Sequence, residues 1–325
     1  MTTRTEPSAR GRRALVTGGA GFIGSHVADS LRAREWAVLV VDDLSTGVEA
    51  NVPEGAELEA LDIADSARLR RVVETFRPTV VCHLAAQSSV TVSVREPERD
   101  FASNVRGTFN VAESAKDVGG FVVFASTGGA LYGDRAPVPT SEAYPPEPLA
   151  PYGASKLAGE GYVATWGRFY DRPNVALRLG NVYGPRQSKH GEAGVVAIFS
   201  DRLARGEAPT VFGEGKPTRD YVHVHDVAAA FVLAAEQARG GTFNVGWGRE
   251  VDVLRLLAEL QQAAGTAIEP RFEPLRPGEL ERSALDSSAI RAALGWEPRV
   301  ELSEGLRETY RWYAETSVGE PKRGA

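Results

Sequence analysis

The sequence has almost no cysteine and no long apolar run. One cysteine, Cys82, and one methionine occur among its 325 residues. A single cysteine excludes an internal disulfide and a cysteine-based metal cluster within the chain. No apolar stretch approaches the ~18–20 residues that a bilayer-spanning helix needs. Segment 1–13, MTTRTEPSARGRR, is polar and basic, with no apolar signal core after it. We therefore expect a cytoplasmic protein that does not bind a membrane.

The chain also lacks an excess of charge of one sign. Its formal net charge is −6, and 25% of its residues are charged while 42% are hydrophobic. This composition is ordinary for a globular protein and leaves no broad basic footprint, so nucleic acid is not an expected partner. The length is sufficient for one large α/β domain with a smaller partner domain.

Short apolar segments alternate with helical patterns in the first half of the chain. Such segments, rich in β-branched residues, are typical of parallel strands that are buried on both faces. They lie at 13–18, 36–42, 79–85, 121–126 and 174–180, and helical patterns at 22–34, 66–76 and 100–117 separate several of them. The alternation predicts an α/β fold with a doubly wound parallel sheet of the Rossmann class.

The alternation stops beyond about residue 184, where proline and glycine become frequent. Within that part, 221–247 still has a helix-then-strand pattern, so we expect the chain to return to the first domain once. The predicted Rossmann domain comprises 11–180 plus 218–247. A smaller, mixed α/β C-terminal domain comprises 181–217 plus 248–319, and 1–10 and 320–325 are expected to be flexible tails.

A glycine-rich stretch, TGGAGFIG, joins the first predicted strand to the first predicted helix. Gly18, Gly21 and Gly24 allow a tight turn and a close approach of a pyrophosphate to the helix N-terminus, which favours negative charge. The second predicted strand ends in Asp42, whose carboxylate suits both hydroxyls of an adenosine ribose and repels a 2′-phosphate. Together these features predict NAD rather than NADP; the alternative is a plain glycine turn beside a capping aspartate.

Tyr152 and Lys156 stand four residues apart in PYGASK, a spacing that puts them on one face of a helix. A tyrosine with its ordinary pKa of roughly 10 is a poor base at neutral pH. A nearby ammonium favours the phenolate and lowers that pKa, so the pair is a candidate acid/base. Two hydroxyls, those of Ser126 and Thr127, end the fourth predicted strand.

These motifs resemble those of the extended short-chain dehydrogenase/reductase superfamily, in its nucleotide-sugar branch. The resemblance runs from about Arg13 to about Tyr310 and includes VVDDLSTG, CHLAAQSSVTVSVREP, LRLGNVYGPR and TRDYVHVHDVA. It implies that the Rossmann domain binds NAD and that the smaller domain binds a nucleotide sugar. It also implies a homodimer formed through helices near 100–117 and 153–169. Apolar residues on the second helix are consistent with a contact face of that dimer, and core burial explains them equally well: Leu157, Tyr162, Val163 and Trp166.

The resemblance also implies roles for individual residues. Its cofactor contacts are Gly18, Gly21, Phe22, Ile23, Gly24, Asp42, Asp62, Ile63, Leu84, Ala85, Ala86, Asn104, Tyr152 and Lys156. Its substrate contacts are Ser126, Thr127, Asn181, Phe212, Arg219, Arg276 and Ser283. The implied catalytic residues are Thr127, Tyr152 and Lys156. Counting from the strand puts the catalytic hydroxyl at Thr127, but counting back from Tyr132 puts that position at Gly128. Ser126 is the alternative catalytic hydroxyl. A third possibility is that both hydroxyls only bond backbone groups and so close the end of the strand.

The residues after Thr127 bear on the reaction. Dehydratase relatives in this branch continue with Asp-Glu, and decarboxylating relatives keep a glutamate, whereas this chain has Gly128-Gly129. The resemblance therefore implies NAD-dependent 4-epimerisation of a UDP-hexose, UDP-glucose or UDP-galactose, through a transient 4-keto sugar. The alternatives are epimerisation of a UDP-N-acetylhexosamine or UDP-uronate, and a non-catalytic NAD-binding regulator.

Two further features concern substrate choice and metal. Ser283 stands seven residues after Arg276, where relatives restricted to plain hexoses resemble one another in carrying a bulky aromatic. A serine leaves room for a 2-acetamido group, which predicts activity on UDP-N-acetylglucosamine as well.

His223 and His225 are two residues apart, like neighbours on one face of a strand, and such a pair could suggest a metal site. No acidic cluster adjoins them in the sequence, however, and their segment matches a structural part of the family. We therefore expect no metal, and we expect the loop residue His190 to be solvated.

Overall fold

The computed structural model describes residues 11–189, 194–274 and 280–317, and it divides into two compact units. Unit 1 comprises the described residues of Met1–Ser126, Ala150–Leu177 and Ala228–Phe243; unit 2 comprises those of Thr127–Leu149, Arg178–Val227 and Asn244–Ala325. These boundaries differ from the expected ones chiefly because Thr127–Leu149, which begins at the end of a sheet strand, groups with unit 2.

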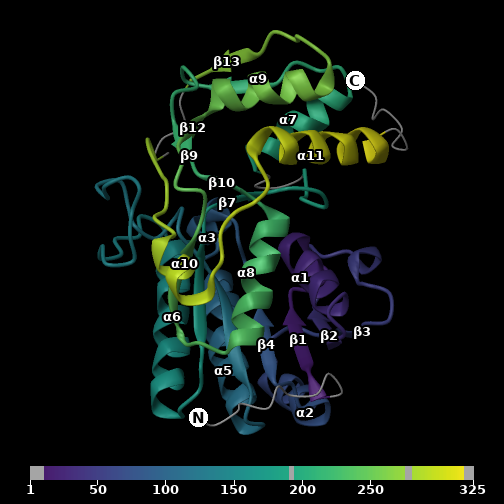
Figure 1. Ribbon diagram of the computed structural model, residues 1–325, viewed down its shortest axis with the longest axis vertical. Helices are drawn as coiled ribbons and strands as arrows, with labels where there is room; N and C mark the ends of the chain where they lie inside the picture. Colours follow the sequence, from purple (N-terminus) through teal and green to yellow (C-terminus); the bar gives the residue numbers. More distant parts are fainter. Residues whose placement is uncertain (1–10, 190–193, 275–279, 318–325) are drawn as a thin grey trace. The chain divides into compact units, whose positions relative to one another are not determined.

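A seven-stranded sheet runs in the order β11-β6-β5-β4-β1-β2-β3. Four neighbouring strands of it, β4, β1, β2 and β3, follow one another in this order in Figure 1. Its strands are β1 (Arg13–Thr17), β2 (Ala37–Asp42), β3 (Glu57–Ala60), β4 (Val80–His83), β5 (Phe121–Thr127), β6 (Val175–Leu179) and β11 (Gly241–Val245). Strand β1 pairs in parallel with both β2 and β4. The strand order therefore reverses at β1, which confirms the predicted doubly wound Rossmann sheet. β3 was missed because its sequence, ELEA, has no apolar run.

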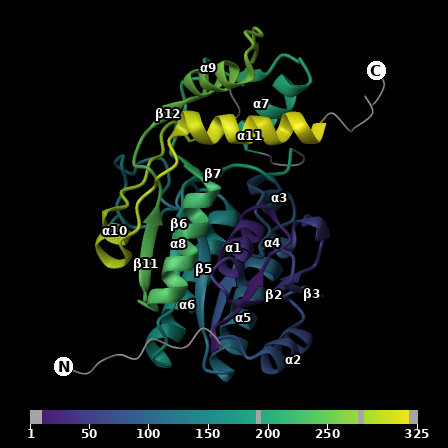
Figure 2. The same cartoon turned by 45° about the vertical axis from the view of Figure 1, so that its right-hand side comes forward.

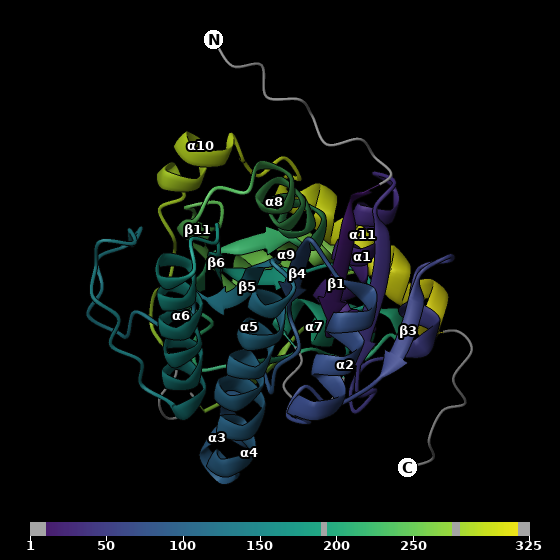
Figure 3. The same ribbon diagram turned by 90° about the horizontal axis from the view of Figure 1, so that it is seen from below.

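The helices that precede and follow these strands include α1 (Phe22–Arg32), α2 (Ser66–Phe76), α5 (Gly107–Asp117), α6 (Pro151–Phe169) and α8 (Val224–Gln237). Helices α2, α5 and α6 pack side by side along one face of the sheet (Figure 3). Between β4 and α5 the chain forms α3 (Val90–Arg95), α4 (Pro97–Phe101) and a π-helical turn, η3 (Ala102–Arg106). Apolar strand residues such as Leu15, Val81 and Phe124 form the core with Leu69 of α2 and Val111 of α5.

Unit 2 is built from short strand pairs and helices, as expected of a smaller mixed α/β domain. Strand β7 (Asn181–Tyr183) pairs in parallel with β10 (Tyr221–His223), and β8 (Thr210–Phe212) pairs in parallel with β13 (Arg271–Glu273). β9 (Thr218–Arg219) and β12 (Val251–Asp252) are antiparallel. The helices are α7 (Val195–Ala204), α9 (Val253–Ala264), α10 (Ser288–Leu294) and α11 (Leu302–Ser317).

Helices α7, α9 and α11 pack against one another (Figure 2). Their apolar faces meet the short strands in a second core that contains Tyr183, Phe199, Val211, Leu256 and Leu306. This core shares no residues with the core formed by the seven-stranded sheet and its helices. The strands and loops of unit 2 are therefore stabilised by a hydrophobic core of their own. Among the described residues, no helix is both long and apolar enough to cross a bilayer.

Candidate functional site

The glycine-rich loop after β1 is closed so tightly that side chains are excluded. Gly18 has φ +69, and a Cβ there would lie 2.6 Å from the backbone nitrogen of Ala85; a Cβ at Gly24 would lie 2.0 Å from the carbonyl oxygen of Gly18. Helix α1 then begins at Phe22 with Gly21 as its N-cap and no side-chain capping bond. Backbone N–H groups at this helix N-terminus therefore stay available to a pyrophosphate. The cradle fits a dinucleotide.

The carboxylate of Asp42, at the end of β2, is held firmly in place. Its two oxygens accept hydrogen bonds from Ala20 N (3.0 Å) and Leu44 N (2.9 Å). Burial raises the pKa of Asp42, and the two N–H groups counter that rise in its pKa. Because Ala20 belongs to the glycine loop, this bond fixes the acid relative to the pyrophosphate cradle. Each oxygen keeps acceptor capacity for a ribose hydroxyl.

The remaining cofactor candidates follow the neighbouring strands at the same edge of the sheet. Asp62 and Ile63 come after β3; Asp62 accepts from Ala64 N (2.8 Å), and Ile63 is buried with its carbonyl bound by the Asn110 amide. Leu84, Ala85 and Ala86 come directly after β4, and Phe22 and Ile23 form the first turn of α1. The carboxyl edge of a doubly wound sheet, at the strand where the order reverses, is where such folds bind ligands.

A buried hydrogen-bonded chain that sequence reasoning missed supports this edge. Thr17 Oγ1 lies 2.7 Å from His83 Nδ1, and His83 Nε2 lies 2.9 Å from Thr108 Oγ1. Thr108 donates its hydroxyl proton to the Asn104 carbonyl (2.6 Å), so His83 Nε2 must be the donor to Thr108. Burial, together with the positive charge of Lys156, lowers the pKa of His83 to about 3, which keeps its ring neutral.

Helix α6 carries Tyr152 and Lys156 in its first two turns. Tyr152 N donates to Ser93 Oγ (3.1 Å), which anchors the start of the helix to α3. Lys156 is only 3% exposed, and its Nζ lies 4.5 Å from the centroid of the Phe124 ring. Burial lowers the pKa of Lys156 to about 8, while the charges of Asp100 and Glu160 oppose that fall. The ammonium is therefore present at neutral pH and can be lost just above it.

Asn104, in the π-helical turn η3, joins three segments. Its Oδ1 accepts from Gln87 N (2.9 Å), and the two protons of its Nδ2 are shared among three acceptors at 2.8–3.1 Å: the Gln87 carbonyl, Asp100 Oδ1 and Ser155 Oγ. These bonds connect the loop after β4, helix α4 and helix α6. We interpret Asn104 as a residue that positions the cofactor loop and the Tyr152 helix through its neighbours.

The two hydroxyls at the end of β5 differ in their surroundings. Thr127 Oγ1 accepts from Ala130 N (3.2 Å), which fixes its rotamer and leaves its own proton available for donation. Ser126 Oγ is buried and has no hydrogen-bond partner among the residues that the structure describes. Neighbouring strand residues point to opposite faces, so only one of these hydroxyls can face a given ligand.

Gly128 and Gly129 have packed surroundings within unit 2. A Cβ at Gly128 would lie 2.5 Å from Leu285 Cδ1, and a Cβ at Gly129 would lie 3.4 Å from Asn181 Oδ1. Leu285 is fixed because its backbone N donates to the buried carboxylate of Asp220 (3.0 Å). The space that an acidic side chain at 128 would need is therefore filled by a leucine.

The other substrate candidates lie in unit 2 at strand ends or beyond. Asn181 begins β7, and its N donates to the Asp220 carbonyl (2.8 Å). Phe212 ends β8, and Arg219 ends β9 with a bond from Nη1 to the Thr218 carbonyl (2.8 Å). Ser283 is half-buried. Arg276 lies outside the described residues, as does His190.

Known proteins match nearly the whole chain. The model of the NAD dependent epimerase/dehydratase family matches residues 14–246. UDP-glucose 4-epimerase of Mycolicibacterium smegmatis is 45% identical over 94% of this chain and 99% of that protein. The crystal structure of Thermus thermophilus UDP-glucose 4-epimerase in complex with NAD has a TM-score of 0.87 at 45% identity, over 93% and 98% of the two chains. The UDP-N-acetylglucosamine 4-epimerase from Methanobrevibacter ruminantium M1, in complex with UDP-N-acetylmuramic acid, has a TM-score of 0.89 at 32% identity, over 94% and 99%.

Proposed function

Since this chain belongs to the NAD dependent epimerase/dehydratase family, we propose that it is an NAD-dependent isomerase that interconverts UDP-glucose and UDP-galactose. Its similarity to the UDP-glucose 4-epimerases of M. smegmatis and T. thermophilus, each over more than nine tenths of the chain, supports this activity. The glycine cradle and the anchored Asp42 fit the NAD that accompanies the second of these proteins.

The observation that favours epimerisation over dehydration is the packing of Leu285 against Gly128. Dehydration needs an additional acid and base beside the sugar, and related dehydratases carry them directly after the strand-end hydroxyl. Here both of those positions are glycine, and Leu285 packs so close to Gly128 that an acidic side chain there would require the leucine side chain to move. The site can bind and orient a hydroxyl but has no second proton-transfer group there.

Each catalytic residue has a role that follows from its surroundings. Tyr152 removes the proton of the 4-hydroxyl and later returns it. Lys156 holds a positive charge one helical turn away, which favours the phenolate of Tyr152. Thr127 donates a hydrogen bond to a sugar oxygen, because its oxygen already accepts from Ala130 N and its proton stays available for donation. NAD, when bound, supplies reversible hydride exchange at C4 of the sugar.

The activity is tested by incubating the purified chain with UDP-glucose and, separately, UDP-galactose, and following both sugars by proton NMR. We expect each to convert to the same equilibrium mixture without added NAD, because the cofactor is regenerated in every cycle. A reduced or dehydrated product, or no reaction with either sugar, would falsify the proposed activity.

The cofactor assignment predicts the effect of Asp42→Ala. Loss of the carboxylate removes its bonds to the ribose and its repulsion of a 2′-phosphate. We expect NAD affinity to fall by roughly 10-fold or more, as for a lost charge-assisted hydrogen bond, and NADP binding to improve. Fluorescence titration with both dinucleotides measures the change. Asp43→Ala is the control, because Asp43 is exposed and its carboxylate bonds the backbone N–H and hydroxyl of Ser45, its hydrogen-bond partner among the described residues. A wild-type preference for NADP would contradict the assignment.

Paired alanine variants distinguish the two strand-end hydroxyls. Thr127→Ala should lower kcat on the order of 10²-fold, as for one lost oriented hydrogen bond. Ser126→Ala should leave kcat nearly unchanged, because it removes a buried hydroxyl that has no partner among the described residues. Steady-state kinetics on UDP-galactose decide between them. If Ser126→Ala is the more damaging variant, the catalytic hydroxyl is Ser126.

A second candidate substrate, UDP-N-acetylglucosamine, is favoured by the half-buried Ser283 and by similarity to the M. ruminantium enzyme. We expect measurable 4-epimerisation of this sugar by the wild type and its loss in Ser283→Tyr, with UDP-glucose activity retained, because a tyrosine fills the acetamido space. Ser288→Tyr, at an exposed position, is the control. A panel that adds UDP-glucuronate tests the uronate alternative. Strict inactivity of the wild type on UDP-N-acetylglucosamine would remove Ser283 from the specificity argument.

We also propose that the enzyme is a cytoplasmic homodimer. An aromatic cluster on helices α5 and α6 supports the dimer, since the rings of Phe109, Tyr162 and Trp166 meet edge to face and Phe169 is 78% exposed. Val163 does not contribute to such a surface, because it is buried in the core. Light scattering tests the dimer, and fractionation of the native cell tests the location.

A further inference from the structure

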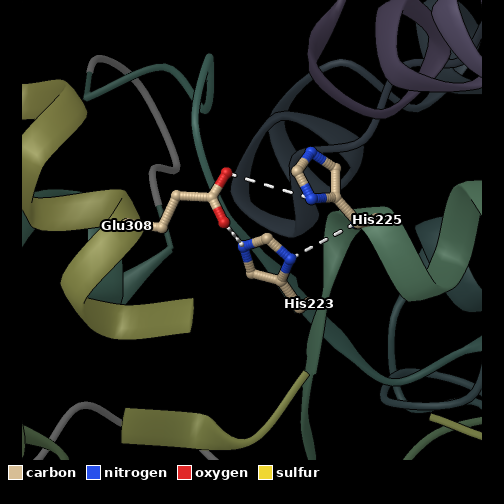
Figure 4. A group of neighbouring side chains, drawn as sticks. All are labelled: His223, His225 and Glu308. Carbon is tan, nitrogen blue, oxygen red and sulfur yellow. Dashed lines mark hydrogen bonds and ion pairs between the residues drawn. The ribbon is translucent and has the colours of Figure 1, made fainter. Parts of the chain in front are cut away.

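Two histidines and a glutamate converge in unit 2, on three elements that carry none of the site residues assigned above. His223 ends β10, His225 lies in the first turn of α8, and Glu308 lies on α11 (Figure 4). The distances are 3.8 Å from His223 Nε2 to Glu308 Oε2 and 3.9 Å from His225 Nδ1 to Glu308 Oε1. One donor atom from each of the three residues lies within 4.8 Å of the others.

The helix carrying Glu308 can approach His223 because a glycine stands one turn earlier. A Cβ at Gly305 would lie 2.8 Å from His223 Cδ2 and closer still to the Tyr183 hydroxyl. Positions three apart share a helix face, so Gly305 and Glu308 both face the imidazoles. The ring of Tyr183 packs edge to face against His223 at 5.2 Å between centroids, which fixes the orientation of the buried imidazole.

Hydrogen bonds outside the cluster join the start of α8 to the segment that leads into α11. The carboxylate of Asp226, next to His225, accepts hydrogen bonds from Arg299 N and Val300 N at 3.0 Å, just before α11 begins. The Trp296 indole donates to the Asp226 carbonyl at 2.8 Å. The start of α8 and the approach to α11 are therefore joined by three hydrogen bonds, which keep the backbone segments that carry the cluster next to each other before any ion arrives.

We propose that His223, His225 and Glu308 bind one divalent transition-metal ion of the Zn²⁺ class. Two imidazoles and a carboxylate are a donor set that suits Zn²⁺, whereas Mg²⁺ and Ca²⁺ prefer oxygen ligands alone. Zinc–ligand bonds of about 2.0–2.1 Å place tetrahedral donors roughly 3.4 Å apart. The two histidine–glutamate separations need to shorten by a few tenths of an ångström. The widest pair of donor atoms, which lies within 4.8 Å, needs to close by up to roughly 1.4 Å through side-chain rotation. A water is expected as the fourth ligand.

Ion binding at His223 costs one hydrogen bond. The backbone N of His225 donates a long 3.5 Å bond to His223 Nδ1, and coordination through Nε2 puts the ring proton on Nδ1 and so removes that bond. In return the ion links the β10–α8 junction to α11. The site is therefore structural: it stabilises unit 2, and epimerisation proceeds without the ion. It does not depend on the function proposed above.

The test uses the full chain without a histidine tag, freed of metal with EDTA and desalted. Calorimetric titration with ZnCl₂ should show one ion per chain, and Zn²⁺ should raise the thermal midpoint whereas Mg²⁺ should not. His225→Ala and Glu308→Gln should each weaken Zn²⁺ binding by about tenfold or more and abolish the thermal shift. Both side chains are partly exposed, so these variants should fold; His223 is avoided because it is fully buried.

Glu304→Gln is the matched control, because Glu304 is exposed and lies on α11 one turn before Glu308. It should bind Zn²⁺ like the wild type. Circular dichroism of all variants without metal confirms that they are folded. Equal Zn²⁺ affinity in the wild type, His225→Ala and Glu308→Gln overturns the proposal, and so does a wild type without saturable one-site binding.

Discussion

Tyr152→Phe is expected to lower kcat for UDP-galactose by about 10³-fold or more while NAD content and substrate KM stay near those of the wild type. The substitution removes only the phenolic oxygen, and general acid/base groups contribute roughly 10²–10⁴-fold to rate. The backbone of residue 152 stays in place, because its N–H is bound by Ser93 Oγ and its carbonyl accepts from Ser155 Oγ. Position and packing are therefore retained, and the loss reports proton transfer.

The measurement is steady-state kinetics together with the absorbance of bound dinucleotide after purification. Tyr170→Phe is the matched control, since Tyr170 directly follows the same helix, is 37% exposed and keeps its ring contact with Trp166 as phenylalanine. The control should retain full activity. If Tyr152→Phe keeps more than a tenth of wild-type kcat, another residue is the acid/base.

Lys156→Met is expected to lower kcat by roughly 10²–10³-fold, because the positive charge that favours the Tyr152 phenolate is lost. Methionine fills a similar volume, so the buried position is not left as a cavity. Lys116→Met is the control: Lys116 sits at the end of α5 and pairs with Glu113 and Asp117 near the surface. We expect that variant to retain wild-type kcat.

The pH profile gives a second readout for Lys156. Burial lowers the pKa of Lys156 to about 8, so the ammonium is present below that pH and is lost as the pH rises through it. Wild-type kcat/KM should therefore fall on the alkaline side near pH 8, and this limb should be missing in Lys156→Met. An alkaline limb that persists unchanged in the variant would assign it to a different group.

Several predictions from local pattern are confirmed because local chemistry determines them. Five buried strands were predicted from short β-branched segments, and all five occur in the sheet in the doubly wound order. The glycine spacing identified the loop that the structure shows closed against Ala85. NAD dependence and the epimerase family, both predicted from motifs, are confirmed by the family match. The roles of individual site residues and the domain boundaries stay predictions.

Other features had no signal in the sequence. Strand β3 pairs at the sheet edge although ELEA is not apolar, because an edge strand needs backbone pairing more than burial. The π-helical turn that carries Asn104 followed no periodic pattern. For Val163 the sequence left a dimer face and the core equally open, and the packing of α6 places it in the core.

The sequence by itself determined the fold class, the cofactor and the placement of Tyr152 and Lys156 on one helix. Each depends on residues within a few positions of one another: strand periodicity, a glycine turn, and a spacing of four on a helix. Only the tertiary structure decided which atoms occupy the space around these motifs. Leu285 closes the position beside Gly128, and Glu308 meets the two histidines of the YVHVHDV segment. Both contacts join residues far apart in the chain, and they form because packing of separate elements brings them together, which no local pattern specifies.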